Sequence, residues 1–490
     1  MSLQYIEDFS SSYASSSSSS SPASPSPPSP ILTVQWATTN VVLTGHLDGT
    51  LCAFDANNGT LLAQIKAHTE SLHSLTIDER GETALSSSID SSASLWSLRE
   101  LETKAASSKG AAQRIVPGED GEELLTTSEP SSMDLQPIKS ITAILDTEGQ
   151  PLDLPTAALH PSGRFFAAAG SGAVLSLHSA GQADFGELLC SNPYEPASSA
   201  APPPSVYALS FAFSPSGKYV AMGTDFGHVH LFSIVQSSSS SPPTLSRVAL
   251  YTSHALPIRS LAFDSSSTGG DNHLFVGSDD RLVTLYDVAS LSSLGSSSSS
   301  GSALKILTNP VSFLQGHKGS IDHLAPVPVA STSYMRKHNS ANSSRAGKSR
   351  PPLLLATTSV QDGFIRLWDL DQRPKRSVCV IRAGGDVTTA AATAPSALPN
   401  GDSVESNGEV NGEAPGQSTT TTTTASSSSS SAPSSMGPRG ATSLAWRPLP
   451  LSRDSDAGFE AATAAGSAFV AGGTDGVLRW YRASGTGGDL

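Results

Sequence analysis

The chain of 490 residues has few cysteines, little positive charge and no long apolar run. Its three cysteines (Cys52, Cys190 and Cys379) are far apart and odd in number, so they predict neither a disulfide framework nor a metal-ligand set. Such a composition fits a reducing compartment. Because no run of about 18 apolar residues occurs, we expect no membrane-spanning helix. The N-terminal MSLQYIEDF is acidic and lacks an apolar core, so we expect no signal peptide.

Positive charge is scarce, with 29 Lys and Arg against 43 Asp and Glu and a formal net charge of −14. Binding to a nucleic acid backbone or an anionic membrane needs concentrated Lys and Arg. We therefore expect no direct nucleic acid partner and no membrane partner. The segment NSSRAGKS (342–349) is similar to a phosphate-binding loop, but Asn342 stands where the first glycine is needed. We expect no cofactor, no metal site and no small-molecule substrate.

Several stretches consist mainly of Ser, Thr, Pro and Gly. Such segments bury too little apolar surface to offset the entropy that is lost when they become ordered. We expect disordered insertions at about 10–30, 101–137, 236–243, 290–302, 332–350 and 384–438. Roughly 300 residues remain in short apolar runs, which is enough for one large propeller. A short helix is expected only at Ser97–Ser108.

One phrase recurs along the chain, most clearly as QDGFIRLWDL at 361–370. An Asp-Gly turn at Asp362 opens the phrase, and Trp368 closes the alternating strand that follows. Weaker copies occur at 45–55, 87–97, 224–234, 278–288 and 472–482. A repeated β unit sets the architecture before any single residue is considered.

Strand-like runs before these copies, together with a weaker unit near 156–179, make seven units in all. The interval from Phe54 to Trp96 matches the length typical of WD40 repeats, which the units resemble. The predicted fold is all-β, a seven-bladed WD40 β-propeller that forms a single domain over 1–490. We expect the isolated strand at 4–9 to pair with the last unit and so close the ring.

Two units contain all the residue types of a buried polar relay. In WD40 repeats a turn carboxylate is linked through an imidazole and a hydroxyl to an indole N–H, so that every buried polar atom has a partner. The two sets are His68, Ser86, Asp90 and Trp96 in unit two, and His317, Thr358, Asp362 and Trp368 in unit six. A Ser-His-Asp triad uses the same residue types. Their recurrence within a repeat favours a structural role, and we expect no enzyme.

Unit five departs from this pattern. It keeps His254 and Asp280 but has Val276 and Tyr286 where a hydroxyl and a Trp would complete the relay. We therefore expect its relay to be incomplete.

The later units have a more specific resemblance. The segments at 211–234, HALPIRSLAF (254–263) and VGSDDRLVTLYDV (276–288) resemble the WD-repeat subunit of the superkiller (Ski) complex. The animal counterpart of that family also belongs to the Paf transcription-elongation complex. The resemblance covers the seven units and the strand at 4–9, and it is sharpest at HALPIRSLAF.

This resemblance implies a non-catalytic scaffold, both cytoplasmic and nuclear. Members of the family bind the TPR subunit of the superkiller complex, which also holds an RNA helicase that feeds RNA to the exosome for 3′-to-5′ mRNA decay. Fungal members also act in meiotic recombination, by binding the protein that starts double-strand breaks. Both partners would offer a short Gln-Arg-x-x-hydrophobic segment to one face of the propeller.

Residues near the N-terminal end of each inner strand should lie on that face. Tyr and Arg are common interface anchors, so Tyr207 and Arg259 are the first candidates. Each could instead line a water-filled channel. The candidate partner-binding residues are Gln35, His73, Tyr207, Arg259, Asp322 and Thr442.

Two other functions remain open from the sequence. One is a different WD40 adaptor, such as a ubiquitin-ligase substrate receptor or a subunit of a chromatin or transcription-elongation complex. The other is an enzyme, which would need a polar cluster outside the repeat positions. We find no such cluster in the sequence.

Overall fold

The computed structural model describes a large part of the chain, all of it within one compact unit that excludes 390–437. The described residues are 4–12, 28–108, 135–192, 206–236, 242–264, 272–292, 305–307, 309–327, 354–370, 377–383, 440–448 and 468–484. Most of each predicted insertion, and the whole of 342–349, lies outside them.

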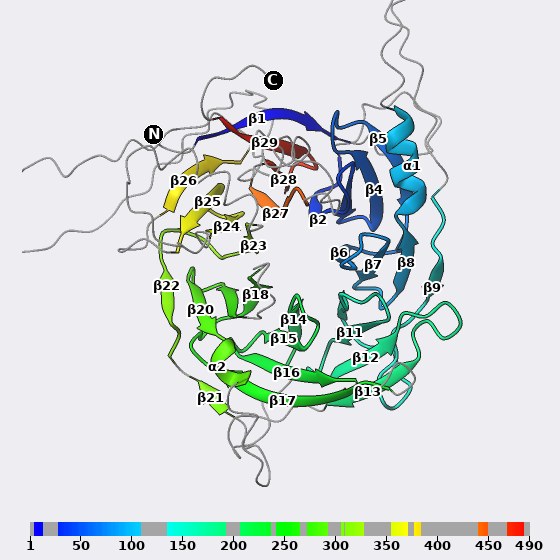
Figure 1. Cartoon of the computed structure of the whole chain (residues 1–490), viewed down its shortest axis with the longest axis vertical. Helices are drawn as coiled ribbons and strands as arrows, with labels where there is room; N and C mark the ends of the chain where they lie inside the picture. The colour runs from blue at the N-terminus through cyan, green and yellow to red at the C-terminus, as the bar shows by residue number, and fades with distance from the viewer. Residues whose placement is uncertain are drawn as a thin grey trace, which may run out of the picture. The chain divides into compact units, whose positions relative to one another are not determined.

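The described residues form seven β-sheets that stand around a central axis, in chain order (Figure 1). From the centre outward, blade one contains β2 (Ile31–Trp36), β3 (Val41–His46), β4 (Thr50–Asp55) and β5 (Leu61–Lys66). Blade two contains β6 (Leu72–Ile77), β7 (Thr83–Ser88), β8 (Ala93–Ser97) and β9 (Lys139–Ile141). Blade three contains β10 (Thr156–Leu159), β11 (Phe165–Ala169), β12 (Leu175–Ser179) and β13 (Leu188–Asn192).

The remaining blades follow the same order. Blade four contains β14 (Ala208–Phe213), β15 (Tyr219–Thr224), β16 (Val229–Val235) and β17 (Thr244–Tyr251), with β21 (Lys305–Leu307) parallel to β17 at its outer edge. Blade five contains β18 (Ile258–Phe263), β19 (His273–Ser278), β20 (Val283–Asp287) and β22 (Ser312–Leu314). Blade six contains β23 (His323–Pro326), β24 (Leu354–Ser359), β25 (Phe364–Asp369) and β26 (Ser377–Arg382). The seven-bladed propeller predicted from the repeat is confirmed.

Blade seven joins the two ends of the described chain. It contains β27 (Ala441–Trp446), β28 (Ala468–Gly473), β29 (Leu478–Ser484) and, as its outer strand, β1 (Gln4–Ser11). The strand β1 runs antiparallel to β29 and is fastened by a fully buried Tyr5, which packs against Trp446 and Phe469. Closing the ring in this way leaves blade seven with four strands and no exposed third-strand edge.

The described residues contain two helices, both in connections between strands. Helix α1 (Arg99–Ser108) is the helix expected at Ser97–Ser108, and α2 (Ala289–Ser292) is a single turn. Leu101 and Ala105 of α1 are buried in the core with Leu135. The disordered insertion predicted at about 101–137 is therefore ordered at 101–108, where the helix expected within it packs its apolar side on the core. No helix of the described residues is long and apolar enough to cross a membrane.

Neighbouring blades meet at one repeated position of the second strand. This position is glycine in blades one, four, five and seven, where a Cβ atom would lie 2.3–2.7 Å from a large side chain at the start of the inner strand of the next blade or just before it. The pairs are Gly45 with Leu72, Gly223 with Ile258, Gly277 with Ile321, and Gly472 with Ile31. We call this contact the seam.

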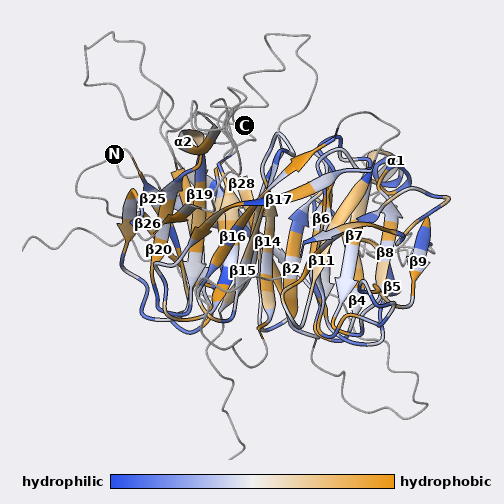
Figure 2. Cartoon of the chain, turned by 90° about the horizontal axis from the view of Figure 1, so that it is seen from below, coloured by the Kyte–Doolittle hydropathy of each residue, from blue (hydrophilic) through white to orange (hydrophobic). Residues whose placement is uncertain are grey.

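Two other blades fill the seam in the opposite way. Ala169 of blade three precedes a blade whose inner strand begins with Ala208, and Thr358 of blade six precedes Ala441. A side chain on the second strand is thus matched by a small residue on the next inner strand. Glycine is thus matched with a large side chain, and a residue that has a Cβ atom is matched with alanine, in keeping with the close packing of protein interiors. In Figure 2 much of the apolar colour follows the strands that form these contacts.

We expect Tyr5→Ala to lower the free energy of unfolding by about 3–5 kcal/mol, because it empties a fully buried aromatic site between β1 and blade seven. The matched control is Ile6→Ala, which truncates an exposed side chain of the same strand and should change stability little. Urea unfolding of the two variants measures the difference. Equal stability losses would show that β1 does not fasten the ring through Tyr5.

Candidate functional site

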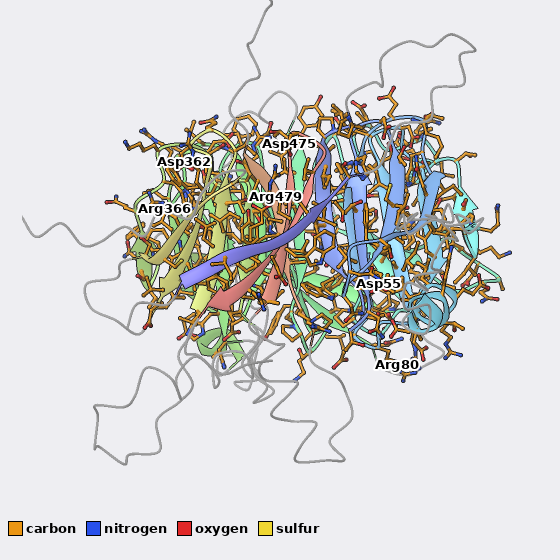
Figure 3. All side chains as sticks on the ribbon, turned by 90° about the horizontal axis from the view of Figure 1, so that it is seen from above. Asp55, Arg80, Asp362, Arg366, Asp475 and Arg479 are labelled. Carbon is orange, nitrogen blue, oxygen red and sulfur yellow. The ribbon has the colours of Figure 1, made fainter. Side chains whose placement is uncertain are left out.

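The functional surface is set by the alternating direction of the strands. Because each blade is antiparallel, the loops that enter the inner strands and the turns between second and third strands lie at one end of the sheets. We call this end the upper face and the opposite end the lower face. In Figure 3, Asp362 and Asp475, which belong to two upper turns, lie toward the upper face, and Asp55 and Arg80 lie toward the lower face.

The relay predicted in blade two is present, with one additional member. His68 Nε2 lies 2.8 Å from the hydroxyl of Ser86, and Trp96 Nε1 donates to the same oxygen at 2.8 Å. The carboxylate of Asp90 is 3.9 Å from His68 Nδ1 and reaches it through the hydroxyl of Ser92, which is 2.5 Å from each. Sequence reasoning missed Ser92 because the repeat pattern contains no signal for a bridging hydroxyl.

In blade six the hydroxyl of the relay belongs to Thr357. His317 Nδ1 lies 2.8 Å from Asp362, its Nε2 lies 2.7 Å from Thr357 Oγ1, and Trp368 Nε1 donates to Thr357 at 2.9 Å. The assignment of Thr358 to this relay is wrong. Successive side chains of a strand point to opposite faces, so Thr358 points away from the relay and fills the seam instead.

Blade five also has a relay, contrary to the prediction that Val276 breaks it. His254 Nδ1 lies 2.7 Å from Asp280, and its Nε2 lies 2.9 Å from Thr284 Oγ1. Thr284 is the cross-strand partner of Val276, so the hydroxyl is supplied by the third strand in place of the second. The hydroxyl of Tyr286 makes a short hydrogen bond with Ser253 in place of the indole contact.

These sets hold the blades together and cannot serve as catalytic triads. The hydroxyl-bearing residues Ser86, Thr284 and Thr357 are all fully buried. In blades two and six the same oxygen also receives the indole N–H, which takes the place that a substrate would need. Burial with every partner satisfied is the property of a structural network.

In blade seven an ion pair takes the place of the relay and supplies a partner for the carboxylate of the upper turn. Arg479 Nη2 lies 2.5 Å from Asp475, and its Nε lies 3.9 Å from Glu7 of β1. Sequence reasoning missed Arg479, although its spacing from the turn Asp equals that of Arg366 from Asp362 within the repeat phrase.

Blades one and three use a histidine from within the blade. His46 Nε2 lies 2.8 Å from Thr44 Oγ1, and His178 Nε2 lies 2.8 Å from the hydroxyl of Ser176. In both cases the hydroxyl and the imidazole are two residues apart on one strand, which places them on the same face. This Ser/Thr-x-His spacing is visible in the sequence and could have identified them.

Burial lowers the pKa of several of these histidines. It lowers the pKa of His68 to about 4, although Asp90 acts in the opposite direction. It also lowers the pKa of His323 to about 4 and those of His46 and His178 below their usual value. These imidazoles are therefore neutral in the folded protein at pH 7.

We expect the free energy of unfolding to decrease as the pH falls from about 6.5 to about 4. In this range the unfolded chain binds protons at these histidines while the folded chain does not, so acid favours unfolding. Urea unfolding at a series of pH values measures the trend. A free energy that stays constant or rises toward pH 4 would contradict the burial of neutral imidazoles.

We expect Thr357→Val to lower the free energy of unfolding by about 1–3 kcal/mol, because it leaves His317 and Trp368 without their shared partner. The matched control is Thr358→Val at the next position. The Thr358 hydroxyl is buried with no hydrogen-bond partner among the described residues, so its replacement by a methyl group should be neutral or stabilising. Equal losses of unfolding free energy in the two variants would indicate that Thr358, and not Thr357 alone, belongs to the relay.

Four of the six candidate partner-binding residues occupy equivalent positions in four different blades. His73, Arg259 and Thr442 occupy the bulge at the beginning of the inner strand, and Asp322 directly precedes β23. A bulge turns its side chain away from the regular ladder. The hydroxyl of Thr442 nevertheless donates to the Ile31 carbonyl at 2.6 Å, and His73 Nε2 lies 3.2 Å from Thr156 Oγ1. These two side chains join neighbouring blades.

The other two candidates lie elsewhere. Gln35 pairs with Leu43, three residues beyond the bulge of blade one, and so lies deeper along β2. Tyr207 precedes β14 and pairs with Ser171 of blade three, and its N–H donates to Asp225 in the upper turn of blade four. The structure therefore does not bring Gln35 to the upper rim, whereas it holds Tyr207 there.

Arg259 is a half-exposed cation of the upper face. Its guanidinium forms a forked contact with Asp279, with Nε 3.0 Å and Nη2 2.8 Å from the carboxylate, and its side chain is 47% exposed. This contact raises the pKa of Arg259. Burial raises the pKa of the neighbouring Asp322, which accepts the N–H of Val360 at 2.6 Å. A forked arginine held in one orientation is suited to recognise a carbonyl or carboxylate.

Exposed apolar side chains also occur in the upper loops of blades four and five. Phe226 lies in the upper turn of blade four and Leu256 in the loop that enters blade five, and both are exposed. The two segments are in contact, since a Cβ on Gly227 would lie 2.9 Å from the Leu256 carbonyl. Other exposed large apolar residues in the upper loops are Leu47, Leu145 and Leu154. Among the described residues, no group of His, Cys, Asp and Glu is placed to hold a metal ion.

Comparison with known families agrees with this architecture. The family described as "WD domain, G-beta repeat" matches residues 59–97 and 245–287. Each range runs from the outer strand of one blade to the third strand of the next, and the ranges end in blades two and five, whose relays are described above. No curated protein matches the chain. The described residues thus contain WD repeats within a seven-bladed propeller, a fold that typically acts as a non-catalytic scaffold for protein–protein interaction.

Proposed function

We propose that this protein is a scaffold that binds a short segment of a partner protein on the upper face of blades four and five. The observation that carries the proposal is that exposed Phe226 and Leu256 lie in touching upper loops of these blades, and that the half-exposed, oriented guanidinium of Arg259 stands three residues after Leu256. Interfaces commonly combine an aromatic or aliphatic anchor with an oriented arginine.

The partner that we propose is the TPR subunit of the superkiller complex, which connects the protein to the RNA helicase and to exosome-dependent 3′-to-5′ mRNA decay. The support is the resemblance of HALPIRSLAF, because this segment supplies both Leu256 and Arg259 of the upper face. The same resemblance supports a second role in the initiation of meiotic recombination. For these two roles we propose that the protein acts in both the cytoplasm and the nucleus.

We expect Arg259→Glu to weaken capture of the TPR subunit at least tenfold, because it reverses the charge that Asp279 holds in place. The matched control is Arg80→Glu, which reverses an exposed charge on the lower face (Figure 3). Affinity purification of both variants and the unchanged chain, followed by mass spectrometry, measures the capture, and thermal melting verifies that both variants are folded.

Two outcomes would contradict the proposal in different ways. If the Arg259→Glu variant captures the TPR subunit normally, Arg259 is not part of the binding site. Recovery of a cullin adaptor or a chromatin complex, without any superkiller subunit, would replace the proposed partner and leave the scaffold role intact.

A further inference from the structure

A short two-stranded ribbon lies on the upper face between blades two and three. It is formed by 144–152, within the connection from β9 to β10, and its two strands pair antiparallel through Leu145 and Pro151. The N–H of Leu152 donates to the carbonyl of Ile144 at 2.8 Å. We call residues 144–152 the ribbon.

The two faces of the ribbon differ in burial. Ile144 and Leu152 are buried in the core, in one cluster with Phe166 of blade three. Leu145 and Pro151, one position along on each strand, point to the opposite face, and both are exposed, Leu145 by 43%. Because cross-strand neighbours lie side by side, these two side chains form one apolar surface that the described residues leave uncovered.

The upper turns of both neighbouring blades fasten the ribbon. In blade two, the Ser91 carbonyl accepts the N–H of Ile144 at 2.8 Å, and the Ser91 hydroxyl donates to the Leu152 carbonyl at 2.5 Å. In blade three, the N–H of Ser171 donates to the carbonyl of Asp153, just after the ribbon, at 2.9 Å. A surface that is fixed in this way loses little conformational entropy when a partner binds.

The charge on this part of the upper face is negative throughout. No Lys or Arg occurs from 140 to 163, in the loop that enters β6, or in the upper turns of blades two and three. The carboxylates of Glu148 and Asp153 form no ion pair or hydrogen bond among the described residues. The acidic residues of these segments are Glu70, Asp90, Asp146, Glu148 and Asp153.

We propose that the ribbon is a second docking surface, which binds a short segment of a partner protein that combines aliphatic side chains with Lys or Arg. The aliphatic side chains cover Leu145 and Pro151, and the basic side chains face Glu148 and Asp153. Charge complementarity selects a basic segment, because an acidic one is repelled by every charged group of this surface.

The ribbon differs in charge from the binding surface of blades four and five. There Arg259 presents a cation to a carbonyl or carboxylate, whereas the ribbon presents carboxylates to cations. The two surfaces therefore select different segments, and the loss of one leaves the other intact. The small apolar area favours weak binding that depends on ionic strength.

The test pans a random-peptide phage library against the purified full chain and against its double variant Leu145→Ser, Glu148→Lys. Peptides that are enriched on the unchanged chain alone should combine Leu, Ile or Val with Lys or Arg. The most enriched of them is then made as a fluorescent peptide, and fluorescence anisotropy measures its affinity. Binding should weaken several-fold when the salt concentration is raised, because salt screens exposed charges.

The single variants Leu145→Ser and Glu148→Lys should each weaken binding of this peptide by about fivefold or more. The matched controls are Leu47→Ser, at an exposed leucine in the upper turn of blade one, and Glu79→Lys, at an exposed carboxylate of the lower face. Both controls, and also Arg259→Glu, should bind the peptide as the unchanged chain does. Thermal melting verifies that every variant is folded.

Three outcomes would overturn the docking surface. One is that no peptide is enriched, or that the enriched peptides are acidic or purely polar. Another is that the double variant binds the peptide as well as the unchanged chain. The third is that Arg259→Glu loses the peptide while Leu145→Ser keeps it, which would assign the peptide to blades four and five.

Discussion

The structure depends on close packing between the second strand of one blade and the inner strand of the next. Where the second strand has glycine, as at Gly277, a large residue such as Ile321 fills the space. Where it has Thr358, the next blade begins with Ala441. The seam therefore constrains pairs of residues that are distant in the sequence.

A second constraint acts at the upper end of each blade, where buried polar groups need partners. Blade two satisfies it with His68 and Ser86, blade five with a hydroxyl from the opposite strand, and blade seven with Arg479. The residue types differ but the location is the same in these blades, because any buried polar atom without a partner lowers stability, whatever its type. This explains why the repeat phrase is so variable in sequence and yet regular in structure.

The same rigidity makes the upper loops useful for binding. Residues there are fixed at their ends by the seam and the relays, so Arg259 and Phe226 can be exposed without disturbing the core. The binding surface thus occupies positions that the ring does not need for its own stability.

The sequence by itself determined the all-β repeat, the number of blades, and most members of the relays in blades two and six, because period-two patterns and Asp-containing turns are local signals. It did not distinguish Thr357 from Thr358, since both are buried hydroxyls and only the strand register decides which faces His317. Nor did it reveal Thr284 opposite Val276, or the ion pair between Arg479 and Asp475. These were decided by tertiary structure, because a cross-strand neighbour and an ion-pair partner depend on which residues the folded ring brings together.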